Sequence, residues 1–342
     1  MSTQDFTIVN DERWIRIGNS TGNEAKSISV AAILRAMPEH RERRYSGSYI
    51  DCLIPKNAEV FAVSLAGEQC SKHLNSIPVV NHKQRTKQYA VCVTPLNYKY
   101  SNVHQLVEMI EFNKILGAEL FIFYNYSTNS NVDKILKYYR QQGLVEIIQW
   151  HIPVKVDTWP QKSKPEIHYF GQLPALNDCL HRNAQRSTYV VFQDLDEFII
   201  PRKGYYWNDM MKKLPTDKNA YIFRNAFFRK DWPDNNLTFI RKELAIKYKS
   251  TTLLKSRRER KILEHLRRSK YIVKPKTIDT VGIHNIYRYK DGKSSVHNVE
   301  AEYGLLHHYR DWENPKDYHT GTNDPYTLQY SNELSRSSCL SK

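Results

Sequence analysis

The residues with the clearest chemical potential are three carboxylates that follow an apolar run. Asp194, Asp196 and Glu197 come directly after the run at 189–192 and before a second apolar run at 198–201. Carboxylates are hard oxygen ligands, and two of them one residue apart can share a divalent cation whose other positions stay open for phosphate oxygens. The spacing therefore predicts a cation site for a diphosphate, although an Asp-x-Asp spacing alone also occurs in solvated turns.

Alternating strands and helices are predicted to position this acidic turn. Apolar patterns indicate strands at 89–94, 119–124, 144–149 and 189–192, and helices at 103–116, 132–142 and 172–186. Such alternation is typical of an α/β fold with a mostly parallel central sheet and helices on both faces. Open α/β sheets bind ligands outside the carboxyl ends of their strands, so the turn falls where a ligand crevice is expected.

Length and composition favour one large domain with flanking segments. The chain has 342 residues, of which 40% are hydrophobic and 25% charged, which are globular values. We expect an irregular, β-like N-terminal region at 1–85, an α/β domain at 86–320 and a C-terminal tail at 321–342. The N-terminus shows neither a signal peptide nor the roughly 18 apolar residues of a membrane span.

Positive charge is concentrated in one segment. The net charge is +15, and residues 247–276 carry twelve Lys or Arg against Glu259 and Glu264. This concentration of positive charge attracts an acidic partner, which could be nucleic acid, an anionic membrane, a nucleotide-sugar diphosphate or an acidic glycan. The alternative is a solvated basic helix within 255–270, whose buried edge would contain Ile262, Leu263 and Leu266.

The five cysteines are far apart and form no Cys-x-x-Cys pair. This spacing disfavours a zinc ribbon or a thioredoxin-type site, and the odd number leaves at least one thiol unpaired. Their positions are Cys52, Cys70, Cys92, Cys179 and Cys339.

Several motifs, taken in their order along the chain, resemble glycosyltransferase family 92. They are the segment 116–124 with the following Asn125 and Ser127, and the segments 171–180, 189–201, 282–284 and 307–310. The resemblance covers about residues 88–312. It implies a GT-A-like fold, a UDP-sugar donor (commonly UDP-galactose), a manganese requirement and a β-linked galactosyl product. It also implies a type II membrane protein of the Golgi, whereas this sequence has no N-terminal anchor.

The chemistry of a UDP-sugar adds a reason for a metal centre. The departing diphosphate develops negative charge, which Mn²⁺ or another divalent cation neutralises as a Lewis acid. We expect Asp194, Asp196 and His308 to hold the cation, with His284 and His307 as substitutes for His308. The alternative for each histidine is a satisfied core or surface residue.

An inverting transfer also needs a general base for the acceptor hydroxyl. Glu197 lies next to the metal turn, and Asp231 lies beside aromatic residues that could stack on an acceptor sugar. Each has a structural alternative. Glu197 could hydrogen-bond its own turn, and Asp231 could pair with Arg229 or Lys230.

Six residues near strand ends and at the start of a helix are expected to bind the donor. They are Thr94, Tyr124, Asn125, Gln172, Asn177 and Asp178. Asn125 also begins an Asn-Tyr-Ser sequon, and a glycan there would block the crevice. Either the sequon is unglycosylated or Asn125 lies outside the pocket.

The sequence thus predicts a metal-dependent enzyme that transfers a hexose, galactose by family likeness, from a UDP-sugar to an N-glycan or polysaccharide in the Golgi. One alternative is a nucleic-acid-binding protein that uses 247–276 with Tyr248 and Tyr271, although no RNP-like pair, zinc spacing or Gly-x-x-Gly loop supports it. Another is a non-catalytic carbohydrate-binding protein on the same fold. We expect no nucleic acid as a partner, and a membrane only through an anchor that this chain lacks.

Overall fold

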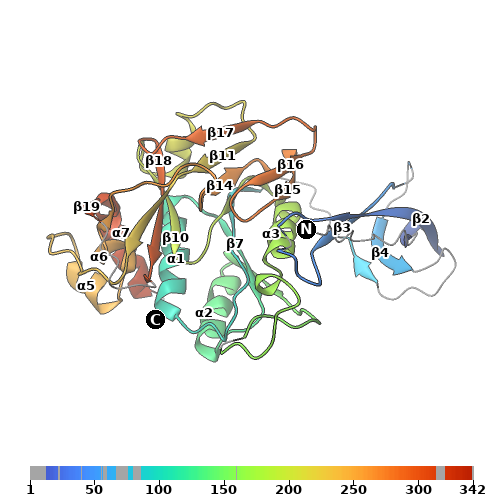
Figure 1. Cartoon of the computed structure of the whole chain (residues 1–342), viewed down its shortest axis with the longest axis horizontal. Helices are drawn as coiled ribbons and strands as arrows, with labels where there is room; N and C mark the ends of the chain where they lie inside the picture. Colours follow the sequence, from blue (N-terminus) through green and yellow to red (C-terminus); the bar gives the residue numbers. More distant parts are fainter. Residues whose placement is uncertain are drawn as a thin grey trace, which may run out of the picture. The chain divides into compact units, whose positions relative to one another are not determined.

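The computed structural model describes residues 13–21, 24–39, 41–54, 56, 60–66, 76–79, 86–158, 160–312 and 320–340. The chain divides into two compact units (Figure 1). The first consists of Met1–Pro38 and Ser46–Lys83, and the second of Glu39–Tyr45 and Gln84–Lys342. All the residues predicted to bind ligands or catalyse lie in the second unit.

The first unit is a five-stranded antiparallel sheet in the order β3-β2-β1-β4-β5. The sequence indicates only irregular, β-like segments there, because no strand shows a sustained alternation. Pairing between neighbouring strands defines the sheet instead. The strands are β1 (Arg13–Thr21), β2 (Glu24–Ala36), β3 (Ser48–Cys52), β4 (Val60–Ala66) and β5 (Ile77–Pro78).

A seven-stranded sheet in the order β17-β11-β14-β9-β6-β7-β8 forms the centre of the second unit. Within these described strands, β14 alone runs against its neighbours, so the prediction of a mostly parallel sheet is confirmed. The four predicted strands correspond to β6 to β9. The strands are β6 (Lys87–Cys92), β7 (Leu120–Asn125), β8 (Val145–Gln149), β9 (Ser187–Phe192), β11 (Ala220–Phe223), β14 (Lys270–Val273) and β17 (Val296–Val299).

Helices cover both faces of this sheet, as predicted. The helices α1 (Val103–Leu116) and α2 (Ser130–Gln141) share one apolar core with Val91 and Phe121. The helix α3 (Gln172–Asn183) shares a second core with Cys92 and Ile122. Successive strand residues point to opposite faces, so alternate residues of β6 and β7 supply the two cores.

The predicted helix at 103–116 is confirmed at both ends. The Asn102 side chain accepts a hydrogen bond from the Gln105 backbone N–H, which satisfies one of the first free donors. Gly117 ends the helix with φ of 124°, a value that residues with a Cβ rarely adopt. Local capping and periodicity therefore determine this element.

A second five-stranded sheet, in the order β10-β18-β12-β13-β19, brings C-terminal residues to the acidic turn. The turn after β9 leads into β10, which pairs antiparallel with β18 and places Glu197 opposite His308. The acidic turn therefore connects the two sheets. The strands are β10 (Glu197–Pro201), β12 (Asn225–Arg229), β13 (Arg257–Glu259), β18 (Gly304–Arg310) and β19 (Gly321–Asn323).

The remaining elements are short or lie at the C-terminus. The segment expected to be a tail contains β19, η3 and α7, and Leu334 of α7 is buried in the core shared with α1. The other elements are α4 (Trp207–Met211), α5 (Lys242–Lys247), α6 (Thr251–Leu254), α7 (Ser331–Leu340), β15 (Ile278–Val281), β16 (Ile286–Tyr289), η1 (Tyr169–Gly171), η2 (Pro275–Thr277) and η3 (Tyr326–Tyr330). In the described part of the chain, no helix has the length and apolarity needed to cross a bilayer.

The alternative prediction of a basic helix within 255–270 is wrong. Residues 257–259 form β13, the loop 260–269 contains no helix, and Lys270 begins β14. The apolar spacing of Ile262 and Leu263 is helix-like, but pairing of β13 with β12 and of β14 with β9 overrides it.

A disulfide ties the end of β6 to α3. Cys92 and Cys179 are bonded, with Cα atoms 6.0 Å apart and a sequence separation of 87. Cys52 is a free thiol. Cys70 and the side chain of Cys339 lie outside the described residues.

Replacing both Cys92 and Cys179 by Ser should lower the free energy of unfolding by about 2–4 kcal/mol, because the unfolded chain loses a long covalent loop. Denaturant unfolding of the non-reduced proteins measures this loss. Cys52→Ser is the matched control and should leave the unfolding midpoint unchanged. An equal midpoint for the double variant and the wild type would show that the bond adds no stability.

Candidate functional site

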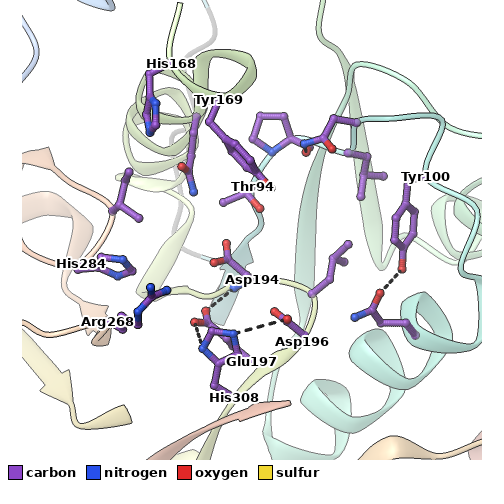
Figure 2. A pocket seen from close by; sticks show the side chains of 17 residues that line it. Thr94, Tyr100, His168, Tyr169, Asp194, Asp196, Glu197, Arg268, His284 and His308 are labelled. Atoms are coloured by element: carbon purple, nitrogen blue, oxygen red, sulfur yellow. Dashed lines mark hydrogen bonds and ion pairs between the residues drawn. The ribbon is translucent and has the colours of Figure 1, made fainter. Parts of the chain in front are cut away.

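The acidic turn opens onto a cavity of about 430 Å³ (Figure 2). The cavity lies beyond the carboxyl ends of the parallel strands β6 and β9, where the sequence predicts a crevice. Residues from the start of α3 and from β18 complete it. Of the residues predicted to bind or catalyse, Thr94, Gln172, Asp194, Asp196, Glu197, His284 and His308 line the cavity.

Asp194 is held in its ionised form by a buried lysine. Its Oδ2 lies 2.9 Å from Lys270 Nζ. Burial raises the pKa of Asp194, but the lysine outweighs it, and the Thr94 hydroxyl also lowers the pKa, so the net shift is downward. Asp194 Oδ1 is buried and forms no hydrogen bond of normal geometry. One oxygen of this carboxylate is therefore buried without a hydrogen-bond donor.

Asp196 and His308 are neighbours in the cavity lining. His308 Nε2 lies 3.6 Å from Asp196 Oδ2, and the Asp196 side chain is 30% exposed. Burial lowers the pKa of His308, but Glu197 and Asp196 outweigh it and the pKa is raised. The backbone supports the pair, because Tyr309 N–H donates to Asp196 O at 2.8 Å.

Glu197 combines a cavity position with structural contacts. Its Oε2 accepts a hydrogen bond from the Asp194 backbone N–H at 2.9 Å, the turn contact considered as its structural alternative. The same oxygen lies 3.3 Å from Lys270 Nζ, and Oε1 lies 3.3 Å from His308 Nδ1. Burial raises the pKa of Glu197 to about 7, although Lys270 opposes the shift.

The residues at this corner suit a divalent cation that a ligand helps to bind. Among the described residues, no group of three His, Cys, Asp or Glu side chains is arranged to hold a metal alone. Asp196 and His308 offer an oxygen and a nitrogen 3.6 Å apart, near the roughly 3 Å between adjacent ligands of a six-coordinate ion. Such ions commonly use one or two carboxylates plus substrate phosphates. The pair would therefore suit Mn²⁺ if a diphosphate supplied further ligands.

Sequence reasoning missed Lys270. It is 2% exposed, and its ammonium contacts both Asp194 and Glu197. Burial lowers the pKa of Lys270, but the two carboxylates outweigh it and raise the pKa. In the sequence it belongs to a basic run, and such runs are usually solvated. The signal that could have identified it is the apolar strand pattern at 271–273, which begins at the next residue.

Four predicted donor residues lie outside the cavity lining. The Tyr124 hydroxyl donates to Asp178 Oδ2 at 2.7 Å, and the same oxygen pairs with Arg182 at 2.6 Å. Asn177 is fully buried and bonds the backbone of Leu173 and Val281.

The fourth, Asn125, donates to Thr128 Oγ1 at 2.9 Å beside the start of α2. The side chain that carries the sequon therefore contacts the loop after β7. Of the two possibilities left by the sequence, this placement agrees with Asn125 outside the pocket.

Asp231 and His284 lie in different surroundings. Asp231 is outside the cavity lining, and Arg229 donates to both its oxygens at 3.1 and 2.7 Å, the pairing considered as its alternative. His284 lines the cavity, and its Nδ1 lies 3.1 Å from Ser269 O. Burial and Lys270 lower the pKa of His284 to about 4, so its ring is neutral near pH 7.

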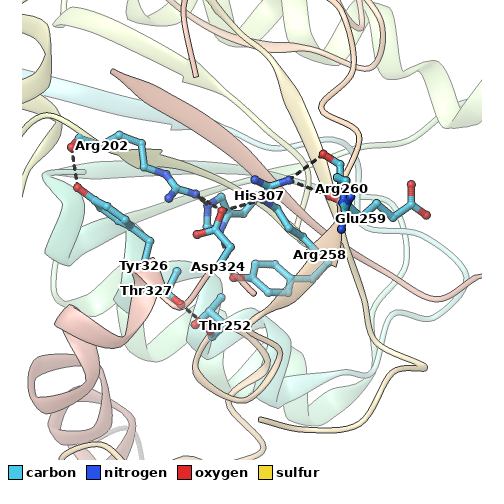
Figure 3. Close-up of polar contacts among 10 residues, drawn as sticks. Arg202, Thr252, Arg258, Glu259, Arg260, His307, Asp324, Tyr326 and Thr327 are labelled. Carbon is cyan, nitrogen blue, oxygen red and sulfur yellow. Dashed lines mark hydrogen bonds and ion pairs between the residues drawn. The ribbon is translucent and has the colours of Figure 1, made fainter. Parts of the chain in front are cut away.

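His307 faces away from the cavity and joins a buried ion-pair cluster (Figure 3). Arg202 donates to His307 Nε2 and to Asp324 Oδ2, both at 2.7 Å, and Arg258 donates to Asp324 Oδ2 at 2.8 Å. Burial lowers the pKa of His307 well below its usual value, and Arg202 adds to the shift. The cluster connects β13, β18 and the residue after β10 to the residue after β19.

The cluster predicts a pH-dependent contribution to stability. Burial raises the pKa of Asp324, but Arg202 and Arg258 outweigh it and lower the pKa below the ordinary 3.8. A lowered carboxyl pKa stabilises the fold above pH 3.8, and the gain is lost as pH falls toward the folded-state value. Asp324→Asn should cost about 2 kcal/mol at pH 7, and the difference from wild type should shrink below pH 4 in denaturant titrations. A difference independent of pH would contradict this origin.

Comparison with known proteins places the chain in a family. Among solved structures, a mycobacterial protein has a TM-score of 0.32 at 10% identity, covering 75% of this chain and 73% of that one. Glucosyl-3-phosphoglycerate synthase from Mycobacterium tuberculosis, in complex with Mn²⁺, UDP and glucosyl-3-phosphoglycerate, has a TM-score of 0.27 at 11% identity, covering 75% and 78%.

Two relatives from Caenorhabditis elegans are each 26% identical to this chain. The beta-1,4-galactosyltransferase galt-1 matches over 192 residues, which is 52% of this chain and 43% of the relative. A second glycosyltransferase family 92 protein matches over 204 residues, or 59% and 39%. The chain thus matches less than half the length of either relative. The sequence model named Glycosyltransferase family 92 matches residues 87–337. The chain therefore belongs to glycosyltransferase family 92, and its α/β architecture agrees with the GT-A-like fold that the resemblance implies.

Proposed function

We propose that this chain is a metal-dependent glycosyltransferase that moves galactose from UDP-galactose to a glycan acceptor with inversion, which gives a β-linked product. Family membership supports a glycosyl transfer, and the relative named as a beta-1,4-galactosyltransferase supports the sugar and the linkage. The observation that carries the proposal is the convergence of Asp194, Asp196, Glu197 and His308 on one cavity at the carboxyl ends of β6 and β9.

In this proposal Asp196 and His308 hold Mn²⁺, and Asp194 lines the same cavity. When bound, the cation would neutralise negative charge that develops on the departing diphosphate. Thr94 and Gln172 contact the donor, because they are the predicted donor residues that line the cavity. Glu197 is the general base that the geometry favours over Asp231, because Glu197 lines the cavity, whereas Arg229 donates to both oxygens of Asp231.

The acceptor is an N-glycan or a polysaccharide, and the compartment is the Golgi lumen. The Cys92–Cys179 disulfide supports an oxidising compartment of this kind, because such bonds form and persist along the secretory pathway.

Incubating the protein with UDP-galactose and a panel of N-glycans, with Mn²⁺ or with EDTA, tests this function. We expect UDP release and a galactosylated acceptor with Mn²⁺ but not with EDTA. The product should show a β-anomeric proton signal, and UDP-glucose should be turned over more slowly. Glycan binding without hydrolysis or transfer would instead support a carbohydrate-binding protein. Oligonucleotide binding with steep salt dependence and no turnover would support the nucleic-acid alternative.

A further inference from the structure

One cationic side chain on the cavity wall has no role in the site described so far. Within the described part of the chain, Arg268 is the only lysine or arginine that lines the cavity. It is exposed, and it pairs with none of the carboxylates there. Lys270, two residues further on, is already bound to Asp194 and Glu197. Arg268 is thus the guanidinium that an anionic ligand in the cavity can reach.

The loop that carries Arg268 is fixed by contacts along its length. His265 Nε2 lies 3.0 Å from Val299 O, and Leu266 N–H donates to Ser269 Oγ at 3.0 Å. Ser269 O lies 3.1 Å from His284 Nδ1. These contacts connect the loop to β17 and to the cavity wall. Binding a ligand should therefore cost little conformational entropy in this part of the backbone.

The backbone at Arg268 is also unusual. Arg268 has φ of 53° and Leu266 has φ of 69°, in the left-handed region that residues with a Cβ rarely occupy. Such conformations cost energy and persist where surrounding contacts enforce them, as they do in this loop. Figure 2 shows Arg268 next to His284 in the lining of the cavity.

These features indicate the chemistry of the ligand. A planar guanidinium donates two parallel hydrogen bonds to a phosphate and keeps its charge at all accessible pH values. A diphosphate has two phosphate groups. One could bind Arg268, and the other could bind a cation held by Asp196 and His308. We propose that Arg268 binds the diphosphate of the nucleotide-sugar directly, including when no metal is bound, an inference that rests on the proposed function.

This assignment also gives the basic segment 247–276 a role within the site. Arg268 is exposed and lines the cavity, and Lys270 is buried and contacts Asp194 and Glu197. Arg267 is the matched control, because it is exposed, carries the same charge and is not part of the cavity lining.

Isothermal titration calorimetry in EDTA, with UDP, uridine and inorganic pyrophosphate as probes, tests the proposal without relying on turnover. Arg268→Ala should weaken UDP and pyrophosphate binding about 10- to 100-fold, the usual worth of a charge-assisted hydrogen bond. Uridine affinity should stay within about twofold, and Arg268→Lys should recover part of the loss. Arg267→Ala should match wild type for all three probes.

Two results would overturn the proposal. If Arg267→Ala and Arg268→Ala weakened UDP binding equally, the ligand would be attracted by the overall positive charge rather than bound by the Arg268 side chain. A loss of uridine affinity as large as the loss of UDP affinity would mean that Arg268 only shapes the cavity.

The same titrations separate this proposal from the proposed function. Arg268-dependent pyrophosphate binding without uridine binding or UDP-galactose turnover would retain the diphosphate site and reject the sugar-transfer function. Wild-type protein that binds none of the three probes would reject both.

Discussion

Asp196→Asn should reduce Mn²⁺-dependent transfer from UDP-galactose about 10³-fold and leave the protein folded. Asparagine keeps the shape of aspartate but removes the charge that would hold a divalent cation next to His308. Stabilising the developing charge of a leaving group by a cation is worth several kcal/mol, which corresponds to this loss of rate. The measurement is the initial rate of UDP release over a Mn²⁺ titration, with circular dichroism as the test of folding.

The side chain of Asp196 is 30% exposed and lies 3.6 Å from His308 Nε2, so its neutralisation should cost little stability. Asp311→Asn is a suitable control, because that carboxylate is 80% exposed and pairs with Lys230 at the surface. It should retain full activity. Full activity of Asp196→Asn, with an unchanged Mn²⁺ optimum, would rule out a metal-binding role for this turn.

Lys270→Met should lower the free energy of unfolding at pH 7 by about 3–5 kcal/mol, the cost of leaving a buried charge without its partner. Methionine preserves most of the volume, so the loss reports the missing ammonium rather than a cavity. Glu197 is buried and the Asp194 side chain is 30% exposed, and in the wild type they lie 3.3 and 2.9 Å from the ammonium that methionine lacks. Guanidinium chloride unfolding of the metal-free proteins gives the difference directly.

The effect should depend on pH in a defined direction. Burial raises the pKa of Asp194, but Lys270 outweighs it and lowers the pKa, so the stability gained from the pair is present above the ordinary value of 3.8. It is lost as pH falls through the lower folded-state value. The gap between Lys270→Met and wild type should therefore narrow in acid. Lys276→Met, an exposed neighbour, should match wild type throughout, and equal stability of both variants at pH 7 would contradict the buried pair.

Local patterns in the sequence were sufficient to predict the elements that build the cavity. The strands β6 to β9 and the helices α1 to α3 each carry their own periodicity, caps or glycine stops, so their existence does not depend on distant contacts. The acidic turn could also be placed, because it follows a buried strand directly. Its position at the carboxyl ends of parallel strands then follows from topology.

The lysine behind the turn could not be predicted from local patterns. Lys270 reaches Asp194 because β14 pairs antiparallel with β9, which sets Tyr271 opposite Phe192. That pairing joins segments about 80 residues apart, and no periodicity within 255–270 encodes it. Reading the same residues as a solvated helix missed both the strand and the ion pair.

The donor residues show a second limit of sequence reasoning. Asn177 and Gln172 lie on the same helix, but Gln172 lines the cavity while Asn177 bonds the backbone at Leu173 and Val281. Side-chain orientation and internal partners decide between the two outcomes. Neither can be read from proximity in the sequence.

The alignment of β10 with β18 determines which of two adjacent histidines meets the carboxylates. Glu197 is opposite His308, while His307, opposite Phe198, points to the other side of the sheet. Because neighbouring strand residues alternate in direction, sliding β18 by one position would present the wrong imidazole and reverse both sets of contacts. Inserting or deleting one residue between β17 and β18 could therefore abolish the proposed metal site without altering any residue that lines the cavity.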